Sequence, residues 1–174
     1  APHVLFNKGE TPNWEYVFYV NGSGQLNVII VDDVFANRII ATADFVLVVD
    51  TDYTAVMTYS GVGDESGIDL QLFNSAGTQL VTTVTPTNAG TYVAMEGAAL
   101  AQKRGTDTGG SFTNGTQWNT RVHNTVLTAT EIANLVQSPT YLTGHEVGIW
   151  HLDEEAGTTA FDSVGGNINK DVSD

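Results

Sequence analysis

The chain has 174 residues, of which 41% are hydrophobic and 20 are acidic against 6 that are basic, giving a net charge of −14. This balance argues against a nucleic-acid partner and against an anionic membrane surface, because both need basic residues for binding. With no cysteine, the chain can form neither disulfides nor thiolate metal sites. No stretch approaches the roughly 18 apolar residues of a membrane span. The length predicts one domain with its own core.

The sequence begins at Ala1, without an initiator methionine or a signal peptide. We therefore expect a mature or excised part of a longer protein.

Most of the chain has the pattern of short strands separated by glycine-containing turns. Asn21-Gly22-Ser23-Gly24 and Asn74-Ser75-Ala76-Gly77 are hairpin signals. The predicted strands, in chain order, are residues 3–8, 14–21, 25–32, 37–43, 45–49, 52–60, 68–73, 78–85 and 98–103. Strands at spacings of about ten residues, with 18 glycines in the chain, favour an all-β antiparallel sandwich or jelly roll.

The pattern changes once, in residues 115–137. Alternation over residues 118–125 predicts a strand. Thr128 is then followed three residues later by Glu131, which is the spacing of a helix capping box. Ile132, Leu135 and Val136 share one helical face. We therefore predict one short helix near residues 129–137.

Three stretches resemble laminin-G-like domains of the concanavalin-A-like lectin and glucanase group. They are VHNTVLTATEI at residues 122–132, NKGETPNWEYVFYVNGSGQL at 7–26 and DYTAVMTYSGVGDESGIDLQLFNSAG at 52–77. Tyr53 stands where the family usually has tryptophan. The resemblance covers most of the chain in a shared order, and it implies an antiparallel jelly-roll β-sandwich. A shared fold does not by itself define a function.

One further stretch resembles the same family but stands at the opposite end of the chain from its usual place. Residues 146–166, EVGIWHLDEEAGTTAFDSVGG, resemble a block that normally opens such a domain. We therefore expect a laminin-G-like sandwich over 1–140 and a strand block over 141–174. This block either completes the same sandwich, as in a permuted domain, or begins the next repeat of a tandem array. Residues 146–152 are too apolar for a free tail, so we expect a strand paired within the chain or with an adjacent copy.

Acidic residues in this block are candidate calcium ligands. Asp153 and Asp162 supply the hard oxygen ligands that calcium requires, and the resemblance implies that one ion is often held by such domains. The alternative is that both carboxylates close turns by accepting backbone hydrogen bonds. Asp153, Glu154 and Glu155 are consecutive, so they alternate between strand faces and do not form the carboxylate set of a glucanase.

Trp14 is the candidate ligand-binding residue, because it follows Pro12-Asn13 at a strand start and sugars stack on exposed aromatic faces. Trp118 and Trp150 lie within strand patterns, so we expect both in the core.

These observations favour a non-catalytic extracellular module that binds carbohydrate or mediates adhesion within a larger surface protein. Its expected partners are a glycan or neighbouring protein subunits, with self-assembly through the C-terminal strand as one route. The first alternative is a structural component of a virion, such as a phage capsid decoration or tail protein, or of a surface layer. The second is a glycoside hydrolase. We expect the protein outside the cell, at a cell surface or at a virion surface.

Overall fold

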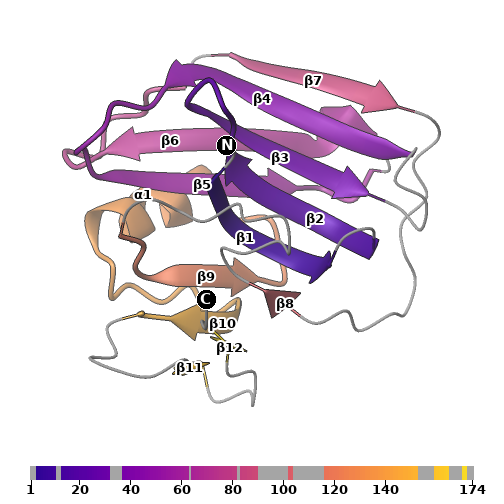
Figure 1. Cartoon of the computed structure of the whole chain (residues 1–174). Helices are drawn as coiled ribbons and strands as arrows, with labels where there is room; N and C mark the ends of the chain where they lie inside the picture. The colour runs from indigo at the N-terminus through magenta and orange to yellow at the C-terminus, as the bar shows by residue number, and fades with distance from the viewer. Residues whose placement is uncertain are drawn as a thin grey trace. The chain divides into compact units, whose positions relative to one another are not determined.

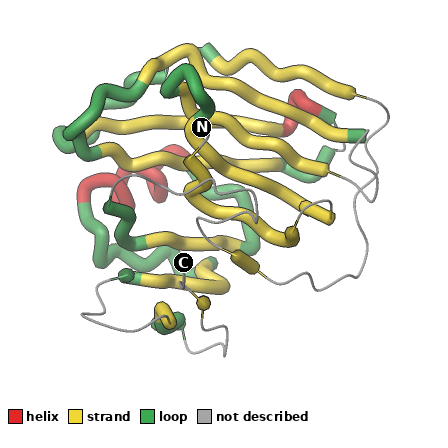
Figure 2. Tube along the Cα trace, viewed as in Figure 1, coloured by secondary structure: helices red, strands yellow, loops and turns green. Residues whose placement is uncertain are grey.

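The structure is a computed structural model that describes residues 3–10, 13–31, 37–62, 64–81, 83–89, 102–103, 116–152, 159–164 and 170–171. It describes only the backbone for residues 8–10, 13–14, 88–89, 102–103, 159–160 and 170–171. Contacts within the chain define two compact units, Ala1–Asn114 and Gly115–Asp174, which are described separately below. Strands occur in both units (Figure 2).

The first unit contains a six-stranded antiparallel sheet with the order β7-β4-β3-β2-β1-β8 (Figure 1). Five strands are long, and β8 adds two residues at one edge. Their bounds are β1 His3–Glu10, β2 Asn13–Val20, β3 Gln25–Val31, β4 Arg38–Val46, β7 Val84–Ala89 and β8 Gln102–Lys103. The two strands predicted at 37–43 and 45–49 are thus one continuous strand, β4.

The hairpin between β2 and β3 follows from its turn residues. The Oδ1 atom of Asn21 accepts hydrogen bonds from the backbone amides of Ser23, at 2.9 Å, and Gln25, at 3.0 Å. Gly24 has a φ angle of +78°, which a residue without a Cβ adopts at little cost. The predicted turn is therefore confirmed, and it fixes the β2–β3 register.

A second, two-stranded sheet in this unit consists of β5, Tyr53–Tyr59, and β6, Ile68–Asn74. The short 3₁₀ helix η1, Glu65–Gly67, connects these strands, and Asp64 caps it by accepting from the Ser66 amide. The core of the unit contains buried side chains from both sheets: Leu26, Val28, Ile30, Ile39, Ala41 and Ala43 from the large sheet, and Ile68, Leu70 and Leu72 from β6. The two sheets therefore share one hydrophobic core.

The chain after β6 differs from the prediction. A hairpin strand was expected at residues 78–85, but Gln79 forms only an isolated bridge with Phe73. The Leu80 amide donates to the Leu72 carbonyl at 2.7 Å, and Val81 is buried. The next strand, β7, begins only at Val84 and pairs with β4. Beyond Val84 the chain therefore pairs with β4 of the larger sheet and does not continue the hairpin with β6.

The second unit contains two small sheets and the α-helix α1, Ala129–Gln137. Strand β9, Thr120–His123, pairs antiparallel with β10, Glu146–Trp150. Strand β11, Thr159–Ala160, pairs with β12, Lys170–Asp171. The prediction that the 146–152 segment pairs as a strand is confirmed for residues 146–150, and the partner strand is in the same chain. Self-assembly through this segment and the division at residue 140 stay predictions.

The mainly antiparallel β-structure and the one short α-helix of the described chain confirm these parts of the sequence prediction. None of the helices in the described ranges has the length and hydrophobicity needed to cross a bilayer.

Candidate functional site

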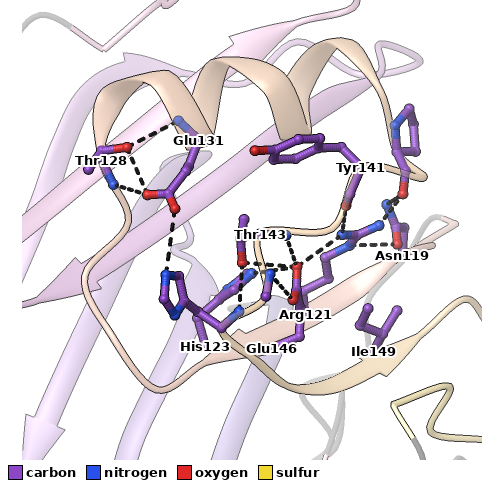
Figure 3. A network of polar contacts seen from close by, with 12 residues as sticks. Asn119, Arg121, His123, Thr128, Glu131, Tyr141, Thr143, Glu146 and Ile149 are labelled. Atoms are coloured by element: carbon purple, nitrogen blue, oxygen red, sulfur yellow. Dashed lines mark hydrogen bonds and ion pairs between the residues drawn. The ribbon is translucent and has the colours of Figure 1, made fainter.

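Charged side chains gather in the second unit where β9, β10 and the segment after α1 meet (Figure 3). Glu146 is central to this network. Its Oε1 atom accepts hydrogen bonds from the Thr143 amide at 2.6 Å and the Thr143 hydroxyl at 3.0 Å. Its Oε2 atom accepts from the Gly144 amide at 2.9 Å. Burial acts to raise the pKa of Glu146, but hydrogen bonds from Thr143, from its own backbone amide and from Gly144 outweigh it and lower the pKa to about 2.

Arg121 connects β9 to the segment that follows the helix. Its guanidinium donates to the backbone carbonyls of Tyr141, at 2.5 Å, and Pro139, and to the side-chain oxygen of Asn119 at 3.1 Å. The Nη1 atom also lies 3.9 Å from Oε1 of Glu146. Burial lowers the pKa of Arg121, and Glu146 acts against that shift. With donors in a rigid planar fork, this arginine satisfies carbonyls that a lysine could not reach together.

Two histidines accompany these groups. His123 Nε2 lies 3.7 Å from Oε1 of Glu146, and His145 Nε2 lies 3.7 Å from Oε1 of Glu131. Burial lowers the pKa of His123, although Glu146 favours its charged form. Burial thus favours the neutral imidazole of His123.

The helix begins with the predicted capping box. The Glu131 amide donates to Oγ1 of Thr128 at 3.3 Å, and the Thr128 amide donates to the Glu131 carboxylate at 2.8 Å. These bonds to Thr128 lower the pKa of Glu131. The prediction of this cap from Thr128 and Glu131 is confirmed.

The hydrogen bonds and ion pairs of this network connect β9, β10 and the segment after α1 to one another. The carboxylates of Glu131 and Glu146 are ionised at neutral pH and accept hydrogen bonds from their own chain, so neither is poised to donate a proton. Among the described residues, no group of three or more histidine, aspartate or glutamate side chains is arranged to hold a metal ion.

The structure describes only part of the set of residues that the sequence predicts to form a site. Trp14 lies in β2 opposite Gly9, and its side chain is outside the described part. Asp153 is outside the described residues. Asp162 forms a bridge with Trp150, and its Oδ1 atom accepts from the amides of Ile149 and Val164, both at 3.0 Å. Asp162 thus closes a turn, as in the alternative considered for it. Its Oδ2 atom is buried, without a hydrogen-bond partner among the described residues.

The expectation that Trp118 is a core residue is wrong. Its side chain is 49% exposed, whereas that of Trp150 is 1% exposed, as expected. The reason is that β9 begins at Thr120, and Asn119 adopts a φ angle of +53°, which breaks the alternation before the strand. The residues two positions away on the same predicted strand face, Thr116 and Thr120, are polar, and they are the sequence signal that could have indicated an exposed tryptophan.

The backbone beside Trp118 is held in place by two hydrogen bonds of Asn119. The Asn119 amide donates to the His151 carbonyl at 3.0 Å, and its Nδ2 atom donates to the Pro139 carbonyl at 3.2 Å. Leu152, next to His151, also has a positive φ angle, of +62°. An exposed indole therefore projects from a fixed and strained part of the backbone, a combination often found at binding sites.

No family model, curated protein or solved structure matches this chain.

Proposed function

We propose that the chain is a non-catalytic extracellular module that binds carbohydrate, built on a laminin-G-like jelly-roll β-sandwich. Support for the fold comes from the antiparallel sheets of the first unit, whose buried side chains share one core. The stretches that resemble the family include the end of β1, all of β2, β5 and β6, and the capped start of the helix.

The observation that carries the binding proposal is the exposure of Trp118. A half-exposed indole is a large apolar surface with one hydrogen-bond donor, and sugar rings present both apolar C–H faces and hydroxyl groups. The hydrogen bonds of Asn119 fix the adjacent backbone before a ligand arrives, so little ordering would be needed on binding. Trp14 remains the second candidate platform, on the basis of its place in the sequence.

Two carboxylates of the second unit, those of Glu131 and Glu146, support a non-catalytic role. A glycoside hydrolase needs a carboxylic acid whose pKa is raised, so that it can protonate the leaving group. Glu131 and Glu146 have lowered pKa values instead, and both are bonded to donors of their own chain.

We also propose one calcium ion at Asp162, with Asp153 as a second candidate ligand on the basis of the sequence. The supporting observation is Oδ2 of Asp162, a buried oxygen without a hydrogen-bond partner among the described residues. Such an oxygen is costly to bury unless something coordinates it.

A glycan array, followed by titration of the best ligand, tests the binding proposal. We expect Trp118→Ala to weaken binding by at least tenfold, while Trp14→Ala reports on the second platform. Phe161→Ala is a matched control, because Phe161 is another exposed aromatic residue of the same unit, at 59%. The proposal is contradicted if the wild-type protein binds no glycan on the array. The role of Trp118 as the binding residue is contradicted if Trp118→Ala binds with the same affinity as the wild type.

The second candidate is a structural component of a virion or surface layer. It is favoured by three exposed valines at the end of β4 and just after it: Val46, Val48 and Val49 are 53%, 60% and 84% exposed. Exposed apolar side chains close together are typical of contacts between subunits. Ordered assemblies seen by electron microscopy, without glycan binding, would favour this candidate.

A further inference from the structure

The sequence of strand β5 is nearly the same in both directions. It reads Tyr-Thr-Ala-Val-Met-Thr-Tyr over Tyr53–Tyr59, with Val56 at its centre. Tyr53 corresponds to Tyr59, Thr54 to Thr58, and Ala55 to Met57, the one pair that differs. A strand of this kind is complementary to a second copy of itself, because antiparallel pairing about its centre places equivalent residues opposite one another.

The central residues of β5 have an open edge in the described structure. Among the described strands, β5 pairs with β6 alone. Leu72 of β6 lies opposite Ala55, and its carbonyl accepts from Leu80 on the side away from β5. Leu72 and Ala55 are therefore a non-hydrogen-bonded pair. Such pairs alternate with hydrogen-bonded pairs in an antiparallel ladder, so Ala55 and Met57 both direct their N–H and C=O groups away from β6.

This edge lacks the features that usually prevent strand addition. Residues 53–59 include no charged residue and no proline, and the register with β6 is regular over all seven residues. The outer strand β7 of the large sheet contains Pro86, and β1 has two register shifts in its pairing with β2. Long, regular and uncharged edges are templates for another strand.

We propose that β5 pairs antiparallel with β5 of a second copy of this chain, about a two-fold axis at Val56. Ala55 then exchanges backbone hydrogen bonds with Met57 of the partner subunit. Val56 faces Val56 of the partner subunit in a non-hydrogen-bonded pair, in which side chains approach most closely. The two hairpins form one four-stranded sheet. This pairing between the two copies requires an open edge only along residues 54–58 of β5.

The charge of the protein predicts how this association depends on salt. Each copy carries a net charge of −14, so two copies repel one another. The interface itself is uncharged, and it is flanked by Asp52, just before the strand, and by Asp69, opposite Thr58 on β6. Added salt screens this repulsion, so the dimer should become tighter as ionic strength rises. This proposal is independent of carbohydrate binding.

Sedimentation velocity over a range of concentrations and salt tests the proposal. We expect a concentration-dependent dimer, which Val56→Lys weakens at least tenfold by placing two ammonium groups opposite one another. Gln71→Lys is the matched control, because Gln71 pairs with Val56 on β6 and lies one strand away from the proposed interface. We expect its dimerisation to equal that of the wild type, and a thermal melt checks that each variant is folded. A wild-type protein that stays monomeric at all concentrations, or equal effects of the two lysines, would overturn the proposal.

Cysteine cross-linking tests the register independently, since the chain has no cysteine of its own. Oxidised Val56→Cys should form a covalent dimer, because the two-fold axis brings this residue next to its own copy. Thr54→Cys alone and Thr58→Cys alone should not, whereas an equimolar mixture of these two variants should. Cross-linking of Thr54→Cys with itself, or absence of cross-linking for Val56→Cys, would overturn the register and with it the proposal.

Discussion

The indole of Trp150 covers the position that a side chain would occupy at Gly148, two residues earlier in β10. A Cβ atom built on Gly148 would lie 2.8 Å from Cζ3 of Trp150, closer than carbon atoms approach in real structures. Trp150 is almost fully buried, so its rigid ring has little space in which to move away. The absence of a side chain at residue 148 therefore permits this tryptophan to be buried.

The first prediction follows from this pair. Gly148→Ala should destabilise the second unit by about 1–3 kcal/mol, the usual effect of overpacking a filled core. Urea unfolding followed by tryptophan fluorescence measures the loss. Gly22→Ala is the control, because a Cβ at Gly22 meets no atom within 4 Å. Equal midpoints for Gly148→Ala and the wild type would contradict the packing described here.

The second prediction concerns the helix cap. Thr128→Ala removes the hydroxyl that accepts from the Glu131 amide, and should cost about 1 kcal/mol. Thr130→Ala changes an exposed threonine inside the same helix and should be neutral or slightly stabilising, because alanine has the higher helix propensity. If both variants unfold at the same urea concentration, the cap does not contribute to stability.

The third prediction concerns pH. The folded-state pKa of Glu146 is about 2, below the ordinary value of 4.5, so its contribution to stability is complete above pH 4.5. It is lost as the pH falls from about 4.5 toward 2, because the unfolded chain then binds a proton that the folded chain does not. Glu146→Gln should therefore lower stability at pH 7 and flatten its decline over this range. Asp52→Asn, which removes an exposed carboxylate outside the network, should leave the slope close to that of the wild type.

The fourth prediction concerns calcium. A chelator should lower the melting temperature and added calcium should restore it, because an ion that binds only the folded state stabilises by mass action. Asp162→Asn retains an oxygen that can accept from Ile149 but replaces the buried carboxylate, so it should abolish the calcium response. Identical melting curves of the wild type with chelator and with calcium would exclude the proposed ion.

Features determined by neighbouring residues were predictable from the sequence. The capping box needs only Thr128 and Glu131, three residues apart, and the β2–β3 turn needs only Asn21 and its glycines. Features determined by distant residues were not. The chain near Val81 packs into the core instead of extending a hairpin, and the start of β9 depends on a bond between Asn119 and His151.

The charged network shows the same limit. The alternation that places Arg121 and His123 on one strand face is visible in the sequence, but their contact with Glu146 depends on the pairing of β10 with β9. Two signals for this network were available in the sequence: the polar face of one predicted strand, and a single glutamate, Glu146, at the start of another. Choosing the correct pair of strands requires the tertiary structure.

The position of β5 and β6 in the chain has a consequence for protein synthesis. Both strands lie between β4 and β7 in sequence, whereas β4 and β7 are direct neighbours in the large sheet. During translation, β4 therefore leaves the ribosome before β7, the strand that pairs with its outer edge, has been synthesised. During that interval the outer edge of β4 is exposed to other molecules, and it is covered only after residues 84–89 have been translated and have paired with it.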